Sequence, residues 1–431
     1  MRRKDNAAKT LATVVGLSSL VLGGAVGCSV PLCEERPGDP RCTSDGGTTA
    51  DLAVLSTRLS KNGGRVNVTA KGATTVKLVL PGNLEVGCTV DGAGNGSCDV
   101  SMSQLAAVTP GQISVTLKAG DKNISAKLRV FSPPTYMDAA GMKATVATGA
   151  RQPSWVQVAK GHVFSSEDSA TNRRINEYQA NGTNLQLLGA REPLLNTMPL
   201  TTMLDVSEGQ VVRATMGAGT YSVENADLAA TTDVYSSFKT VTLTKVNALA
   251  VNRDSTVVAV AGEGTDGPIK AYTVPTPGQT NSAAVMLNGA TAKAVTRVGV
   301  GKLTDTSTVD IVAAHSDGAS VFLQKTGMAS PTLDQTLSSS VGSKLIGPGL
   351  TALALADIDR DGLDDVIAAQ GTSIIVLSID GTTVTSTPVL SSLPGTVDAV
   401  AVGDVSGDGK PDLVIAQKAG AMLTVFLNQA P

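Results

Sequence analysis

The chain has 431 residues, which is enough for two or three domains with buried cores. Hydrophobic residues make up 42% and charged residues 16% of it, and its formal net charge is −3. This composition excludes the basic surface that nucleic-acid binding requires, and the abundance of Gly, Thr, Val and Ala favours short strands and tight turns with little helix.

Residues 1–27 have the pattern of an export signal. Four basic residues near the start precede an uncharged run over residues 10–27. The end of this run resembles a bacterial lipoprotein signal, which implies cleavage before Cys28 and lipid on that cysteine. A transmembrane anchor is the alternative, but the run is short and rich in Gly and Ser. We expect a lipid-anchored protein of the bacterial cell envelope, at the outer membrane, facing the periplasm or the surface; Ser29 resembles an outer-membrane sorting residue.

The cysteines indicate a location outside the cytoplasm. Assigning Cys28 to lipid leaves four that can pair in three ways, and the simplest pairing joins Cys33 to Cys42 and Cys88 to Cys98. Each ring of roughly ten residues would add about 2 to 3 kcal/mol, which makes it a local staple. Removing the signal, with its four basic residues and one acidic residue, changes the formal charge from −3 to −6. We expect no nucleic-acid partner.

Two segments follow the signal. Residues 28–50 are rich in Pro, Gly, Ser and Thr and indicate a flexible tether that contains one short disulfide loop. Residues 51–132 alternate apolar and polar side chains, which predicts roughly seven short strands. A segment of this size and pattern suggests an immunoglobulin-like β-sandwich. Cys88 and Cys98 flank a Gly-rich stretch, so a bridge between them would close a hairpin.

Residues 137–431 repeat at about 50 residues, the scale of one four-stranded propeller blade. Six turn-and-strand segments align, with strands expected to begin near residues 163, 211, 257, 310, 365 and 412. A repeat that cannot bury its own faces must stack on its neighbours, and ring closure removes exposed edges. We therefore predict an all-β protein with a six- or seven-bladed β-propeller. A strand near Lys143–Ala147 should pair with Leu423–Leu427 of the last blade; an open β-solenoid is the alternative.

Two late turns have the spacing of loops that bind a hard cation, most simply Ca²⁺. Acids alternate along each turn, a glycine follows the third ligand position and an Asp stands at position nine. The expected ligands of the first loop are Asp357, Asp359, Asp361, Asp365 and the carbonyl of Leu363; those of the second are Asp404, Ser406, Asp408, Asp412 and the carbonyl of Lys410. Clustered carboxylates raise one another's pKa unless a cation is present. The second loop has one acid fewer, so we expect it to bind more weakly.

An EF-hand loop also begins with this spacing, but it requires Glu at position twelve, where this chain has Ala368 and Ile415. Residues 356–366 and 403–413 instead resemble the calcium loops of FG-GAP repeats, also called VCBS repeats, which occur in integrin α-chain propellers and many secreted bacterial proteins. The resemblance implies two structural calcium ions that clip β-turns. The preceding repeat keeps Asp310 but has Lys302, Thr304 and Thr306 at ligand positions, so no metal is expected there.

The residues offer no evident catalytic group. The two histidines, His162 and His315, are expected in a turn and at a strand end, no nucleophile-elbow motif occurs, and aromatic content is 3%. The leading hypothesis is a non-enzymatic module that presents propeller loops to an unknown protein or glycan. The alternative is an extracellular propeller hydrolase or polysaccharide lyase. A cleft with convergent polar groups near the axis or rim would favour the enzyme, and a plugged channel would favour the module.

Overall fold

The computed structural model describes residues 51–136, 142–145, 152–168, 173–181, 184–191, 200–217, 220–230, 235–264, 267–288, 294–304, 309–316, 318–324, 332–334, 349–380 and 383–430. The predicted signal peptide, Cys28, Cys33 and Cys42 lie outside these residues. The described chain is β-structure apart from one four-residue helix, α2, at Met102–Leu105, which confirms the all-β prediction. Within the same residues, no helix has both the length and the apolar character needed to cross a membrane.

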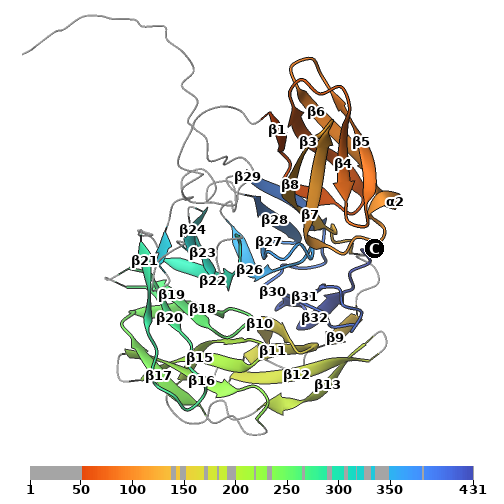
Figure 1. The fold of residues 1–431 in the computed structure, drawn as a ribbon. Helices are drawn as coiled ribbons and strands as arrows, with labels where there is room; N and C mark the ends of the chain where they lie inside the picture. The colour runs from red at the N-terminus through yellow and green to blue at the C-terminus, as the bar shows by residue number, and fades with distance from the viewer. Residues whose placement is uncertain are drawn as a thin grey trace, which may run out of the picture.

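The N-terminal body is one curled sheet of eight strands, in the order β1-β3-β6-β5-β4-β7-β8-β2 (Figure 1). The strands are β1 Leu52–Val54, β2 Arg58–Ser60, β3 Gly63–Ala70, β4 Val76–Leu80, β5 Leu84–Val90, β6 Asn95–Ser101, β7 Gly111–Ala119 and β8 Lys122–Phe131. Strand β1 pairs antiparallel with β3, and β2 pairs parallel with β8, so the first segment bridges the two ends of the sheet. The sheet thereby folds over one core, to which Val66, Leu78, Leu117 and Leu128 contribute. This is the predicted sandwich, with one more strand because its first strand is broken in two.

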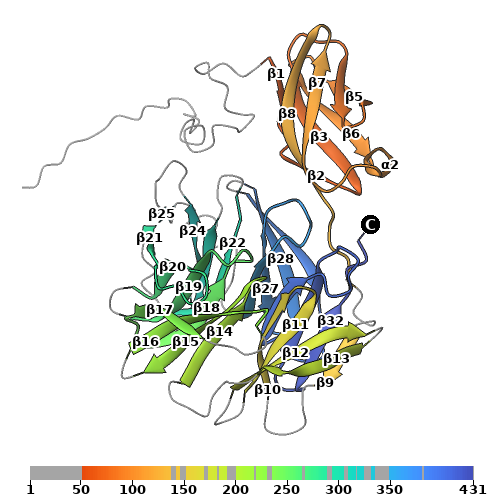
Figure 2. The same ribbon diagram turned by 60° about the horizontal axis from the view of Figure 1, so that its bottom comes forward.

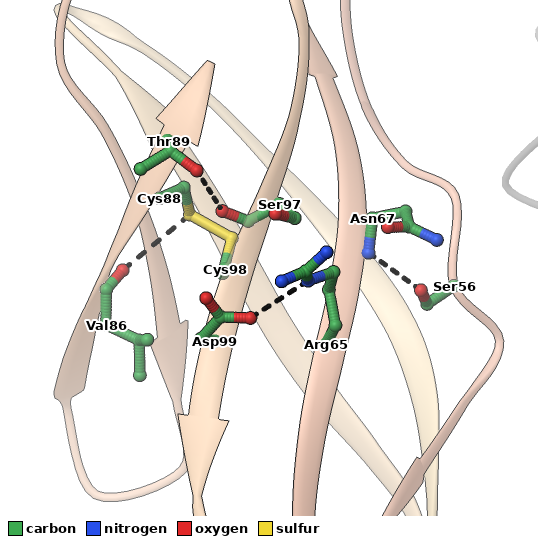
Figure 3. Close-up of a disulfide and its surroundings, with 9 residues drawn as sticks. All are labelled: Ser56, Arg65, Asn67, Val86, Cys88, Thr89, Ser97, Cys98 and Asp99. Carbon is green, nitrogen blue, oxygen red and sulfur yellow. Dashed lines mark hydrogen bonds and ion pairs between the residues drawn. A yellow bond between two sulfur atoms is a disulfide. The ribbon is translucent and has the colours of Figure 1, made fainter.

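Cys88 and Cys98 form a disulfide with an S–S distance of 2.02 Å (Figure 3). They stand opposite each other in the antiparallel pair β5–β6. The Asp91 carboxylate shapes the intervening turn by accepting hydrogen bonds from the amides of Ala93 and Asn95, at 2.9 and 2.8 Å. The bridge therefore staples a hairpin, as the spacing predicts.

The second body is a ring of six four-stranded blades (Figures 1 and 2). Blade one contains β10 Gln152–Ala159, β11 His162–Asp168, β12 Arg173–Asn181 and β13 Asn184–Arg191; blade two contains β14 Leu200–Val206, β15 Gln210–Gly217, β16 Thr220–Asp227 and β17 Ser236–Val241. Blade three contains β18 Lys245–Val251, β19 Val257–Glu263, β20 Ile269–Thr273 and β21 Ala284–Asn288; blade four contains β22 Val295–Gly301, β23 Asp310–His315, β24 Gly318–Gln324 and β25 Thr332–Asp334. Blade five contains β26 Leu350–Ala356, β27 Asp365–Gln370, β28 Ser373–Asp380 and β29 Thr383–Leu390; blade six contains β30 Ala399–Gly403, β31 Asp412–Gln417, β32 Met422–Phe426 and β9 Met142–Thr145.

Strand β9 closes the ring. It precedes blade one in the chain but pairs antiparallel with β32 of blade six, with Ala144 opposite Leu423. This confirms the predicted closure and fixes the number of blades at six among the described residues. The second strand of a blade packs against neighbours on both faces, so its centre is apolar without alternation: all six residues of β31 are buried, and the four central ones, Leu413–Ala416, are apolar. The change from period two in the sandwich to continuous apolar runs in the ring follows from this packing.

Candidate metal centre and axial cavity

The six predicted turns all connect the first and second strands of a blade. The second strands begin at His162, Gln210, Val257, Asp310, Asp365 and Asp412, within one residue of the predicted positions. Neighbouring turns hydrogen-bond to each other: the Lys160 amide donates to Glu208 Oε2 at 2.9 Å, and the Lys302 amide donates to Asp364 Oδ2 at 2.6 Å. The repeat period in the sequence is therefore the step from one blade's turn to the next.

The first acidic loop, residues 357–365, gathers its acids at the end of β26. Oxygens of Asp357, Asp359 and Asp361 lie within 4.8 Å of one another. Asp359 and Asp361 are 4% and 2% exposed. The Gly362 amide donates to Asp357 Oδ2 at 3.0 Å and the Leu363 amide to Asp361 Oδ1 at 2.9 Å. Gly362 has the positive φ, 88°, that its position predicts. The turn thus points its carboxylates towards one another.

Two buried oxygens of this loop, Asp357 Oδ1 and Asp365 Oδ2, have no hydrogen-bond partner. Burial, reinforced by the Asp361 carboxylate, raises the pKa of Asp357 to about 6. The same two causes raise the pKa of Asp359 to about 7, although the positive charge of Arg58 opposes them. Burial and the Asp359 carboxylate also raise the pKa of Asp365 well above its ordinary value. Buried, unpartnered carboxylate oxygens are costly, so this donor set fits a hard cation.

The second acidic loop, residues 404–412, has the same backbone shape but different hydrogen bonding. Gly407 and Gly409 both have φ 78°, at the positions where the first loop has Arg360 at 62° and Gly362 at 88°. Its acids are satisfied from within the loop. Asp404 accepts from the amides of Gly407, Asp408 and Gly409, at 2.7, 3.1 and 2.9 Å, and Asp408 accepts from Ser406 Oγ and the Lys410 amide, both at 3.0 Å.

The Asp at position nine shows the difference most directly. Asp310 Oδ2 accepts from the Leu303 amide at 2.8 Å, and Asp412 Oδ2 accepts from the Val405 amide at 3.0 Å. In both turns this carboxylate caps the loop. At the corresponding position of the first acidic loop, Ser378 Oγ donates to Asp365 Oδ1 at 2.5 Å while Oδ2 has no partner. The first loop therefore differs from the other two turns because a buried carboxylate oxygen at position nine has no hydrogen-bond donor.

A cavity of about 280 Å³ follows the ring axis and is lined by the innermost strands of all six blades. Five of these strands share a register shift near their start: Pro153/Val156, Thr201/Met203, Val246/Ala248, Val295/Arg297 and Leu350/Ala352. Bulges re-aim side chains. Trp155, Asn247 and Arg297 reach the cavity from or beside these bulges. Nothing in the sequence pattern predicts them, because a bulge leaves the apolar character of the strand unchanged.

Asp205 is a buried acid in the cavity wall that the sequence motifs do not reveal. It accepts from Gln157 Nε2 at 3.0 Å and from the amides of Val206 and Val251, both at 2.9 Å. These partners belong to blades one, two and three, so Asp205 ties three blades together. Burial raises its pKa to about 6. The signal in the sequence is an acid inside the apolar run Leu204-Asp205-Val206.

Three further charged residues line the cavity: Arg297, Asp398 and Lys418. The Arg297 Nε donates to the Thr351 carbonyl at 3.1 Å, and burial lowers its pKa while the Asp398 carboxylate opposes that shift. Asp398 Oδ2 accepts from the Lys418 amide at 2.7 Å. Neither histidine lines the cavity; His162 contacts Glu177 at 2.6 Å, and His315 contacts Ser320 at 3.2 Å. The channel is thus an open, charged cavity.

Residues 357–415 match the model of an FG-GAP-like repeat, which confirms the predicted resemblance. No curated protein matches the chain in sequence. Among solved structures, a family AA12 carbohydrate-active enzyme of Trichoderma reesei has 12% identity and a TM-score of 0.43, covering 69% of this chain and 98% of that chain. The PQQ-bound aldose sugar dehydrogenase of Streptomyces coelicolor has 14% identity and a TM-score of 0.42, covering 68% and 98%. At these values the likenesses carry no inference about substrate or cofactor.

Proposed function

We propose that this protein is a binding module of the bacterial cell envelope, anchored by lipid at Cys28, with a calcium-stabilised propeller that holds a polar group of a protein or glycan in its axial cavity. The observation that carries the proposal is the convergence of Arg297, Asp398 and Lys418, from blades four and six, on one open cavity. A pocket with a few convergent polar groups is the usual form of a ligand site.

Calcium would be held in the first acidic loop by Asp357, Asp359, Asp361 and Asp365. The support is chemical: these are hard oxygen donors, and two of their buried oxygens lack a partner. The ion would neutralise the clustered acids and fix the β26–β27 turn. Asp404, Asp408 and Asp412 would hold a second ion more weakly, because their oxygens already accept backbone amides.

Calcium removal tests the clip. An ion present at ten times its Kd stabilises the folded state by about 1.4 kcal/mol. We expect a chelator to lower the melting temperature of the full chain by roughly 2 to 4 °C. Protease sensitivity should rise in blades five and six. Asp361→Ala should respond less to calcium than the wild type does, and any response that remains would come from the second loop. A melting temperature that changes with neither calcium nor chelator would refute the proposal that calcium stabilises this turn.

Ligand capture tests the cavity. The wild-type chain, presented to intact cells and cell-envelope fractions, should retain a ligand that Arg297→Gln and Lys418→Gln both lose. Lys410→Gln, an equivalent change on the second acidic loop, should retain it. Equal capture by all variants would place binding elsewhere on the molecule.

Cys28→Ser should separately release the protein from membranes, and continued membrane retention would contradict the lipid anchor.

The open cavity also favours the second candidate, a hydrolase or polysaccharide lyase, because convergent polar groups near the axis are what an enzyme would need. Against it, both oxygens of Asp205 are engaged, and the Ser154 hydroxyl contacts the Ser166 hydroxyl at 3.0 Å. Among the described lining residues there is no histidine to serve as a base. Incubation with envelope polysaccharides separates the two: new reducing or unsaturated ends that Arg297→Gln abolishes would establish catalysis.

A further inference from the structure

The sandwich contacts the propeller at the first acidic loop. The contacts join residues about 230 to 300 positions apart in the chain: Arg58 with Asp359 and Asp361, and Arg129 with the Asp361 carbonyl. The Ser132 amide also donates to the Asp359 carbonyl at 2.8 Å. The sandwich stands beside blade five in both ribbon views (Figures 1 and 2). The loop that would hold calcium is therefore also a docking point for the sandwich.

Arg58 occupies carboxylate oxygens that the cation would use. Its Nη2 lies 2.5 Å from Asp359 Oδ2 and 2.9 Å from Asp361 Oδ2. The guanidinium stacks on Phe131, 4.6 Å from the ring centroid, and its side chain is only 16% exposed. Arg129 also reaches this loop, where its guanidinium donates to the Asp361 backbone carbonyl. Arg58 of the sandwich therefore competes with a cation for oxygens of Asp359 and Asp361.

The interface is open enough for an ion to enter. A cavity of about 450 Å³ lies between the two bodies and is lined by Arg58, Phe131 and Asp359, with Val376 and Thr385 of blade five. The chain between the two bodies is short. Tyr136 is fixed to blade six by its bridge to Asn428, and the Ser132 amide is bonded to the docked loop, with Pro133 and Pro134 between them.

We propose that the sandwich and the divalent cation bind the first acidic loop antagonistically, with Arg58 acting as a built-in cation that calcium displaces. This rests on the proposed calcium clip. Two cations that draw on the same oxygens weaken each other, and linkage requires the effect to be reciprocal. Calcium should loosen the docked sandwich, and removal of Arg58 should tighten calcium.

Site-resolved amide hydrogen exchange of the full chain across a calcium titration tests this, because separate amides report each event. Gly362 and Leu363 report calcium at the first loop, Gly409 reports the second loop, and Ser132 reports docking. In Arg58→Gln, the calcium midpoint at the first loop should fall about tenfold. Arg58→Lys should stay near wild type. Arg65→Gln removes an exposed sandwich ion pair with Asp99 and should change nothing.

A second test uses the wild-type chain alone: the Ser132 amide should exchange faster as calcium protects the Gly362 amide. The Gly409 midpoint should be the same in all variants. Calcium protection at the first loop with an unchanged midpoint in Arg58→Gln, or slower Ser132 exchange in calcium, would overturn the antagonism and leave the clip intact. No calcium effect on exchange at either loop would overturn both the clip and the antagonism.

Discussion

Buried aspartates of this propeller fall into two kinds, which differ in what their oxygens accept. Asp205, Asp310 and Asp412 accept backbone amides and act as ties or caps. Asp365 keeps one buried oxygen without a partner. The same residue type therefore ties or caps the backbone at three positions, and at Asp365 it leaves a buried oxygen without a hydrogen-bond donor. Only the hydrogen-bond partners distinguish them, and a sequence does not state those.

Asp205 should make the stability of the ring depend on pH. Its folded pKa, about 6, lies above the ordinary value of 3.8. Between these values the folded state keeps a proton that the unfolded chain has lost. The stability that the protonated Asp205 carboxyl contributes to the folded state is therefore fully present below about pH 4, and it is lost as the pH rises through 6. Asp205→Asn removes this titration. The free energy of unfolding of wild type minus that of Asp205→Asn should fall by about 2 to 3 kcal/mol from pH 4 to pH 7.

Urea denaturation followed by circular dichroism at each pH measures this difference. Subtracting the variant cancels the titration of the acidic loops, because those sites are distant from Asp205. A difference that stays constant across the range would show that Asp205 does not titrate with folding.

At the scale of the element, the turns are where sequence reasoning succeeds. Acids at alternate positions and a glycine with positive φ determine a turn locally, and the period between repeats places each turn within one residue. The bulges in the innermost strands escape prediction because they arise from packing around the axis. The order of the acids also does not show that the second loop satisfies its own carboxylates, since both loops have the same spacing of donors.

The two acidic loops should respond oppositely to the same substitution at position nine. In chelator, Asp412→Asn puts an amide donor against backbone amides of Val405 and Asn428, so unfolding should become easier by about 1 to 3 kcal/mol. Asp365→Asn removes a clustered charge whose Oδ2 has no donor to lose, so its stability in chelator should equal or exceed that of wild type. Urea denaturation of both variants measures this. An equal loss in Asp365→Asn would mean that its carboxylate is a cap after all.

At the scale of the molecule, long-range pairings decide the architecture. The sequence predicts one of these pairings, the closure of the ring, but not the contact between the sandwich and the propeller. Ring closure follows from the need to cover strand edges, so a strand before blade one could be assigned to blade six. Contact between Arg58 and the first acidic loop could not be predicted. It depends on how two separately patterned bodies meet, and neither periodicity nor motif spacing encodes that.

Closure by β9 should govern the cooperativity of the whole ring. Replacing residues 142–145 by a Gly-Ser sequence of equal length removes the strand that pairs with β32 and leaves an exposed edge. Trp155, the single tryptophan, lies on β10 of blade one and reports this part of the ring. Its thermal transition should move to lower temperature and broaden, and amides of Leu423 and Val425 should exchange faster. The same replacement at residues 383–386, in the outermost strand of blade five, leaves the ring joined and should affect Trp155 less. Equal shifts for the two replacements would mean that any outermost strand contributes as much as the closing one, and that the ring does not depend on the return of the chain to its last blade.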